Sequence, residues 1–200
     1  MNRNCAVIIV AGGKSTRMRI DKRKLPYRGK TLLEATIERG KALSDEVILT
    51  LSRPSDAYYQ LKVVFDREQG KGPLMGLYSG LLETEKDLAL LLPCDMPLVP
   101  VEFLRNLLSL ASGYDITITR HRNTFQPLCA AYSRRVIPDI EEQLKEGDYS
   151  LVSLLQSRTL RSRVVGIEEL TSYNNCGFPF ININTPEDYS FLKSSPSFGF

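Results

Sequence analysis

Residues 11–22, AGGKSTRMRIDK, combine two adjacent glycines with hydroxyl and basic side chains, a set of groups suited to binding phosphate. Gly12 and Gly13 lack a Cβ atom, so the backbone N–H groups of such a turn can approach an anion closely. The neighbouring side chains that can add hydrogen-bond donors or positive charge are Lys14, Ser15, Thr16, Arg17 and Lys22. This much charge suits a triphosphate better than a single phosphate. The glycine pair alone could also be a turn with a solvated basic face, but its place after an apolar run favours phosphate binding.

This stretch matches neither of two common nucleotide-binding loops. A Walker A loop, GxxxxGK[ST], requires a glycine at a spacing that the chain lacks, and the GxGxxG fingerprint of dinucleotide-binding domains is also missing. Redox chemistry with a dinucleotide cofactor therefore loses support.

Two aspartates follow apolar runs elsewhere in the chain. Asp95 stands between Pro93 and Pro97 within LALLLPCDMPLVP, residues 88–100, just after the apolar run. Mg²⁺ commonly binds one or two carboxylates together with substrate phosphates, so Asp95 is a candidate metal ligand. The alternative is a capping or turn aspartate, but Asp95 lies too far upstream to be the N-cap of the helix predicted from residue 101. Asp66 also ends an apolar run, and it could bind metal, base or ribose, or cap a turn.

The elements that must position these residues alternate along the chain. Apolar, β-rich runs predict strands, and amphipathic segments between them predict helices. The predicted strands cover residues 6–11, 47–52, 63–65, 88–93, 115–119, 127–132, 163–167 and 180–185, and the helices cover 31–43, 72–85, 101–111, two segments separated by Gly147, and 186–193. Two of the runs, AVIIV and LALLL, are continuously apolar, as expected of strands that are covered on both faces. The pattern predicts an α/β fold with a mostly parallel sheet, in one domain over residues 1–193 with a short tail at 194–200.

Composition limits the possible functions. The 200 residues include 26 Lys and Arg against 23 Asp and Glu, a net charge of +3, which is too small to indicate binding to nucleic acid or to a membrane surface. The four cysteines are scattered without metal-ligand spacing, which is typical of a reduced cytoplasmic protein. No signal peptide or membrane-spanning run is apparent, so we expect a cytoplasmic protein.

The phosphate-binding stretch also resembles a known signature. The pattern Ala11-Gly12-Gly13-x-Ser15-x-Arg17-Met18-x-x-Asp21-Lys22 is similar to AGGxSxRMGxDK of the MobA family of molybdenum cofactor guanylyltransferases. GPLMG, PCDMPLVP, QPLCAAY and FININTPED resemble later blocks of that family in the same order, so the similarity spans nearly the whole chain. It implies a Rossmann-like three-layer α/β/α fold of the nucleotidyltransferase (GT-A-like) type. It also implies Mg²⁺-dependent transfer of GMP from GTP to molybdopterin or Mo-molybdopterin, with release of pyrophosphate.

The resemblance implies roles for individual residues. The nucleotide-binding residues would be Val10, Ala11, Gly12, Gly13, Ser15, Lys22, Asp66 and Asp95. Arg17, Lys22 and Asp95 would be catalytic, with Asp95 as the magnesium ligand, and Asn182 and Asn184 would lie on the pterin side. Besides GTP and the pterin, the implied partners are cofactor biosynthesis proteins or target molybdoenzymes, in transient contacts.

Three positions depart from the family pattern, and they keep other substrates open. Arg19 replaces a usual glycine, Ser52 stands where asparagine is frequent before arginine, and Gln126 stands where histidine is common. The alternatives are a cytidylyltransferase acting on molybdopterin or on another phosphorylated acceptor, and a noncatalytic adaptor that binds nucleotide and molybdopterin.

The reaction itself requires no protein nucleophile, because the acceptor phosphate is already ionised at neutral pH. We therefore expect His121, the single histidine, to be a solvated loop residue and not a general base. Cys94 and Cys129 fall inside the family blocks, but isolated cysteines are most often small buried apolar residues.

Overall fold

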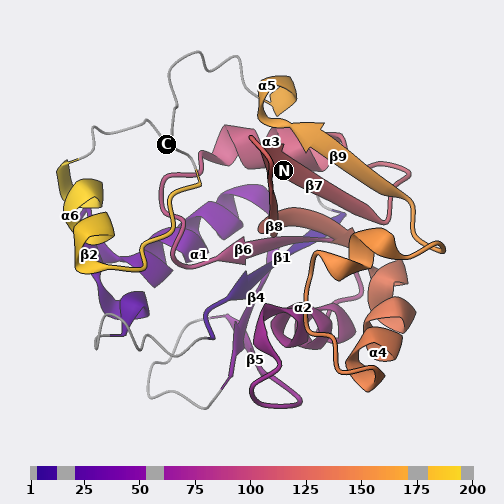
Figure 1. Cartoon of the computed structure of the whole chain (residues 1–200). Helices are drawn as coiled ribbons and strands as arrows, with labels where there is room; N and C mark the ends of the chain where they lie inside the picture. Colours follow the sequence, from indigo (N-terminus) through magenta and orange to yellow (C-terminus); the bar gives the residue numbers. More distant parts are fainter. Residues whose placement is uncertain (1–3, 13–20, 53–60, 171–179, 195–200) are drawn as a thin grey trace.

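A seven-stranded sheet in the order β5-β4-β1-β6-β8-β7-β9 forms the middle of the structure (Figure 1). The computed structural model describes residues 4–12, 21–52, 61–170 and 180–194. The strands of this sheet are β1 (Cys5–Val10), β4 (Glu46–Leu51), β5 (Lys62–Phe65), β6 (Leu88–Pro93), β7 (Ile116–His121), β8 (Thr124–Ser133) and β9 (Ser162–Gly166). A separate antiparallel hairpin consists of β2 (Pro26–Tyr27) and β3 (Lys30–Thr31).

Most strands of the sheet run in the same direction. β8 is antiparallel to its neighbours β6 and β7, whereas the other neighbouring pairs are parallel. Val10, the last residue of β1, is level with Thr50 of β4 and Pro93 of β6. The segments that leave these three strands therefore emerge at one edge, which is where ligands bind in open α/β sheets. The prediction of an α/β fold with a mostly parallel sheet is confirmed.

Helices cover both faces of the sheet (Figure 1). Every second side chain of β1 from Cys5 packs with α1 and α3, and every second one from Ala6 packs with α2 and α4. This alternation explains why the strand is continuously apolar. The α-helices are α1 (Leu32–Leu43), α2 (Gly72–Glu83), α3 (Val101–Ser109), α4 (Ile137–Lys145), α5 (Ile167–Leu170) and α6 (Pro186–Ser194), and the 3₁₀ helices are η1 (Lys22–Lys24), η2 (Arg134–Val136) and η3 (Ser153–Gln156).

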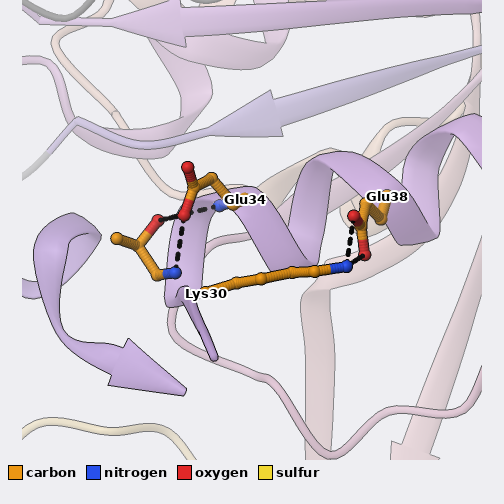
Figure 2. A network of polar contacts seen from close by, with 4 residues as sticks. Lys30, Glu34 and Glu38 are labelled. Carbon is orange, nitrogen blue, oxygen red and sulfur yellow. Dashed lines mark hydrogen bonds and ion pairs between the residues drawn. The ribbon is translucent and has the colours of Figure 1, made fainter. Parts of the chain in front are cut away.

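The start of α1 is fixed by local hydrogen bonds (Figure 2). The backbone N–H of Glu34 donates to Thr31 Oγ1 at 3.2 Å, and the Glu34 carboxylate accepts from the Thr31 backbone N–H at 2.7 Å. This reciprocal arrangement is a capping box. Lys30 pairs with Glu38 along the exposed side of the helix, and such an exposed pair contributes little to stability. The capping box makes α1 begin directly after the β2–β3 hairpin.

Two glycines bring α2 close to the strands that lead into the ligand edge. A Cβ atom at Gly80 would lie 2.7 Å from Ile8 Cγ2, and one at Gly76 would lie 3.0 Å from Thr50 Oγ1. Real Cβ contacts are essentially never as short as the first of these distances, so the helix can pack at this separation because residue 80 has no side chain. Gly80, together with Gly76 at the end of the GPLMG block, therefore allows the packing of α2 against β1 and β4.

The C-terminal part of the fold differs from the prediction in two places. Residues 181–184 form no regular strand: Ile183 is buried in a cluster with residues of the β2–β3 hairpin, α1 and α6, and its N–H donates to the Asp95 carbonyl oxygen at 2.9 Å. The second of the two helices separated by Gly147 is the short 3₁₀ helix η3. Gly147 itself has φ of +78°, the left-handed conformation that ends α4.

In the described ranges no helix is long and apolar enough to cross a membrane. The helix predicted from Pro186 is present as α6 and ends at Ser194, and residues 195–200 lie outside the described residues. The assignment of residues 1–193 to one domain stays a prediction.

Candidate active site

The carboxyl ends of β1 and β6 open into a small pocket of about 120 Å³. Its lining includes Val10, Ala11, Gly12, Lys22 and Asp95. The structure therefore brings Gly12 and Lys22, from the two ends of the glycine-rich stretch, together with Asp95, which lies far from both in the sequence. Gly13, Ser15 and Arg17, which the sequence also assigned to this site, and Arg19, lie outside the described residues.

Gly12 is held close to the end of β4. The Ala11 backbone N–H donates to the Thr50 carbonyl oxygen at 3.0 Å, which continues the pairing of β1 with β4 by one residue. A Cβ atom on Gly12 would then lie 3.2 Å from the Ser52 backbone nitrogen and 3.3 Å from Ser52 Cβ. The absence of a side chain at Gly12 therefore allows close packing against the residue that follows β4.

Lys22 lies at the centre of the polar groups in the pocket. Its ammonium group is 3.6 Å from Asp95 Oδ2 and donates a hydrogen bond to Asn184 Oδ1. The side chains of Lys22 and Asp95 are only 16% and 23% exposed, so little solvent separates the two charges. Three segments, the start of η1, the turn after β6 and the stretch before α6, thus place a cation between two oxygen groups.

The environment of Asp95 favours its protonated form. Burial raises the pKa of the Asp95 carboxyl, and the attraction of Lys22 offsets this only in part. A buried carboxylate whose charge is incompletely balanced attracts a further cation, so its environment suits a metal ligand.

Asn184 is positioned by the start of α6. Its backbone N–H and that of Thr185 both donate to Asp188 Oδ2 at 2.8 Å, and the Asp188 N–H donates to Thr185 Oγ1 at 3.1 Å. The structure groups the side chain of Asn184 with Lys22 and Asp95. The pterin-side role implied for Asn182 and Asn184 stays a prediction. Asn182 lies two residues earlier in the same segment and is half-buried.

Asp66 lies farther along the same edge. It follows β5, which β4 separates from β1, and its backbone N–H donates to the Leu51 carbonyl oxygen at 2.9 Å. Burial raises the pKa of its carboxyl. Asp66 does not line the pocket around Lys22, so a ligand that touched both would extend across the end of β4.

Comparison with known proteins shows the family of the chain. The sequence profile of the MobA-like NTP transferase domain matches residues 7–164. The chain belongs to this family. The molybdenum cofactor guanylyltransferase of Syntrophotalea carbinolica is 32% identical over 200 residues, which cover 98% of this chain and 94% of that protein. The protein of the same name from Pseudomonas putida is 32% identical over 188 residues, covering 92% of this chain and 94% of that protein.

A solved structure shares the fold. The molybdopterin-guanine dinucleotide biosynthesis protein A from Archaeoglobus fulgidus superposes with a TM-score of 0.80 at 22% identity, covering 94% of this chain and 96% of that one. The resemblance inferred from the sequence blocks is thus confirmed at the level of family and fold.

The donor set of this MobA-like site fits a hard cation. Asp95 and Asn184 supply carboxylate and amide oxygens, and both already contact the ammonium group of Lys22. The described residues contain no cluster of three or more His, Cys, Asp or Glu side chains that could hold a metal. Mg²⁺ is nevertheless commonly held by one or two protein oxygens when substrate phosphates and water complete its coordination.

Other reactive side chains near the site are not placed for chemistry. Burial raises the pKa of both Cys94 and Cys129 to about 12, so neither thiol is ionised at neutral pH. His121 is not the solvated loop residue that the sequence predicted: it ends β7, is half-buried, and lies 5.9 Å between ring centroids from Phe180. His121 lies in the hairpin of β7 and β8 and contacts Phe180, and the sequence could not reveal this contact.

Arg23 is a charged pocket residue that the sequence reasoning did not assign to the site. Arg23 lines the pocket and binds the Asp21 carboxylate, with an Nη2–Oδ2 distance of 2.7 Å. The side-chain hydrogen bond from Arg23 is the main reason why the pKa of Asp21 is lowered, and burial opposes it. The spacing DKRK contained the signal, since charged residues two apart can pair across a tight 3₁₀ turn such as η1.

Proposed function

We propose that this protein transfers GMP from GTP to molybdopterin or Mo-molybdopterin, forming the guanine dinucleotide cofactor and releasing pyrophosphate, with Mg²⁺ as the metal ion. The observation that carries the proposal is the meeting of Lys22, Asp95 and Asn184 at the phosphate-binding edge of a MobA-like fold. The names of the relatives that cover nearly the whole chain support the choice of guanine nucleotide and of pterin acceptor.

The proposed reaction is a single displacement at the α-phosphorus of GTP. A phosphate oxygen of the pterin attacks this phosphorus, a new P–O bond forms, and the bond to the oxygen that bridges to the β-phosphorus breaks as pyrophosphate leaves. Most of the barrier comes from bringing two anions together and from charge that develops on the leaving group.

The residues of this chain contribute position and charge. Lys22 lies where its ammonium group can leave Asp95 and Asn184 and bind phosphate oxygens instead. Asp95 and Asn184 are the residues that would hold Mg²⁺, which when bound neutralises part of the phosphate charge. We include Arg17, Gly13 and Ser15 in the nucleotide site from the sequence signature alone. Val10, Ala11 and Gly12 would contact the nucleotide through the backbone, and Asp66 would contact its nucleoside part.

The first test is nucleotide selectivity. Calorimetric titration of the purified protein with GTP, CTP, ATP and UTP, each with Mg²⁺, should give the tightest binding for GTP. Incubation with GTP and molybdopterin should then release one pyrophosphate for each dinucleotide formed.

The other outcomes decide between the alternatives. Tighter binding of CTP would replace the guanylyl by a cytidylyl reaction on the same fold. Selective GTP binding without pyrophosphate release would indicate a noncatalytic adaptor. A protein that binds none of the four nucleotides would refute the phosphate-binding role of residues 11–22.

A further inference from the structure

Arg39 is a buried cation that the reaction described above does not use. It lies on α1, and only 3% of its surface is exposed. Its Nη2 donates to Thr36 Oγ1 at 2.8 Å, and its Nη1 donates to the carbonyl oxygens of Met96 at 2.8 Å and Val99 at 3.2 Å. Within the described ranges, Arg39 forms no ion pair with a carboxylate, and its Nε has no hydrogen-bond partner.

Burying a cation without a counter-charge is unfavourable, so the position of Arg39 needs an explanation. Burial lowers the pKa of Arg39 to about 10, which still leaves the guanidinium charged at neutral pH. An apolar side chain of similar volume would avoid the desolvation cost. Backbone carbonyl dipoles of the turn after β6 are the main groups that balance the charge.

These carbonyls belong to the segment that presents Asp95. Met96 is the next residue in the chain, and Val99 lies just before α3. On its other side, the Asp95 carbonyl oxygen accepts the N–H of Ile183, the residue before Asn184. The turn is therefore hydrogen-bonded on one hand to Arg39 and on the other to the segment that carries Asn184.

We propose that Arg39 is a positioning residue whose guanidinium fixes the turn from Asp95 to Val99 and so orients the Asp95 carboxylate for the nucleotide-bound cation. This role rests on the proposed function. It assigns a contribution to catalysis to a residue of α1 that does not line the pocket around Lys22.

A cavity next to Arg39 makes the proposal testable by chemical rescue. The cavity has a volume of about 770 Å³ and lies between the β2–β3 hairpin, α1 and the start of α3. Its lining includes Arg39, Tyr27, Pro100 and Arg105. Truncating Arg39 to alanine would leave space, continuous with this cavity, for a free guanidinium ion to donate to the Met96 and Val99 carbonyl groups.

The experiment compares Arg39→Ala, Asp95→Asn and the double variant with the wild type. Two quantities are measured: kcat for GMP transfer, and the affinity for Mn²⁺ with GTP, which requires no turnover. We expect Arg39→Ala to lower kcat roughly 10- to 100-fold, because a small displacement of a catalytic group is enough for such a loss. We also expect weaker Mn²⁺–GTP binding, with both defects partly restored by millimolar guanidinium but not by urea.

The double variant separates positioning from general destabilisation. If Arg39 acts through Asp95, Arg39→Ala should have almost no further effect on Mn²⁺–GTP affinity in the Asp95→Asn background. Arg105→Ala is the matched control: Arg105 lines the same cavity, but its side chain is 54% exposed and pairs with Glu102. This variant should match the wild type and should not respond to guanidinium.

Several results would overturn the role of Arg39. They are unchanged kcat and affinity in Arg39→Ala, additive losses in the double variant, or a failure of guanidinium to restore the folded variant. If Arg39→Ala does not fold, the same cycle is measured with Arg39→Lys, which keeps a buried cation but cannot donate to both carbonyls in the same geometry. A wild type that binds Mn²⁺–GTP but transfers no GMP refutes the proposed function instead, and the affinities then still decide whether Arg39 positions Asp95.

Discussion

Replacing Asp95 by asparagine should have opposite effects on activity and stability. The variant removes the carboxylate that we assign to the metal ion, so transfer should fall while Mg²⁺-free GTP binding is retained. Losing one preorganised electrostatic contact commonly lowers kcat about 10²- to 10³-fold, and we expect a loss of this size. The variant should also be more stable than the wild type at neutral pH in metal-free buffer.

The sign of the stability change follows from two competing effects. At 3.6 Å the attraction between Lys22 and Asp95 is at most about 5 kcal/mol with an effective dielectric constant of 20, and partial exposure of both side chains reduces it. Burial nevertheless raises the pKa of Asp95, so desolvation of the carboxylate outweighs this attraction. Ionised Asp95 therefore destabilises the folded state, and the neutral asparagine removes that penalty.

The pH dependence provides the sharper assay. Below the unfolded pKa, Asp95 is protonated in both states and the two proteins should have similar free energies of unfolding. As pH rises from the unfolded pKa to the raised folded pKa, the wild type should lose stability relative to Asp95→Asn, and above the folded pKa the difference should stay constant up to neutral pH. Urea denaturation with a chelator present, across this pH range, measures it.

Asp87→Asn is the matched control, because Asp87 is exposed next to the opposite end of β6. It should leave transfer and the free energy of unfolding at neutral pH unchanged. A less stable Asp95→Asn protein at neutral pH would contradict the electrostatic reasoning, and full activity in that variant would contradict the metal assignment.

Three further predictions concern the framework of the site. Gly80→Ala should be less stable than Gly40→Ala by roughly 1 kcal/mol, because the added Cβ atom would lie 2.7 Å from Ile8 at residue 80 but 3.3 Å from Val47 at residue 40. Equal urea midpoints of the two variants would contradict this. Thr185→Ala should lower the unfolding free energy by about 1 kcal/mol through loss of the α6 cap. The variant should also bind GTP more weakly, because the same cap positions Asn184. Unchanged stability in thermal melting would argue against the cap. Cys94 should resist alkylation at pH 8 in the folded protein, because burial raises the pKa of its thiol to about 12. Rapid labelling of Cys94 before unfolding, detected by mass spectrometry, would contradict this prediction.

Much of the fold could be predicted because its signals are local. Continuously apolar runs such as residues 88–93 show that a strand is covered on both faces, and Thr31 followed by Glu34 indicates where α1 begins. The motifs of the MobA family could also be recognised in the sequence, because they are short segments with fixed spacing between their residues. The sequence did not reveal the one exception to the parallel arrangement of the described strands, since β8 proved antiparallel to β6 and β7.

The candidate site likewise has features that the sequence predicted and features that only the tertiary structure showed. Residue types and spacing alone pointed to phosphate at Gly12 and Lys22 and to a cation at Asp95, because these chemistries depend on glycine, ammonium and carboxylate groups. Only the tertiary structure decided that Asn184 meets Lys22, because that contact joins residues 162 positions apart in the chain. It also decided that Arg39 holds the turn after Asp95, since the hydrogen bonds go to backbone carbonyl groups, which every residue carries and which therefore leave no signal in the sequence.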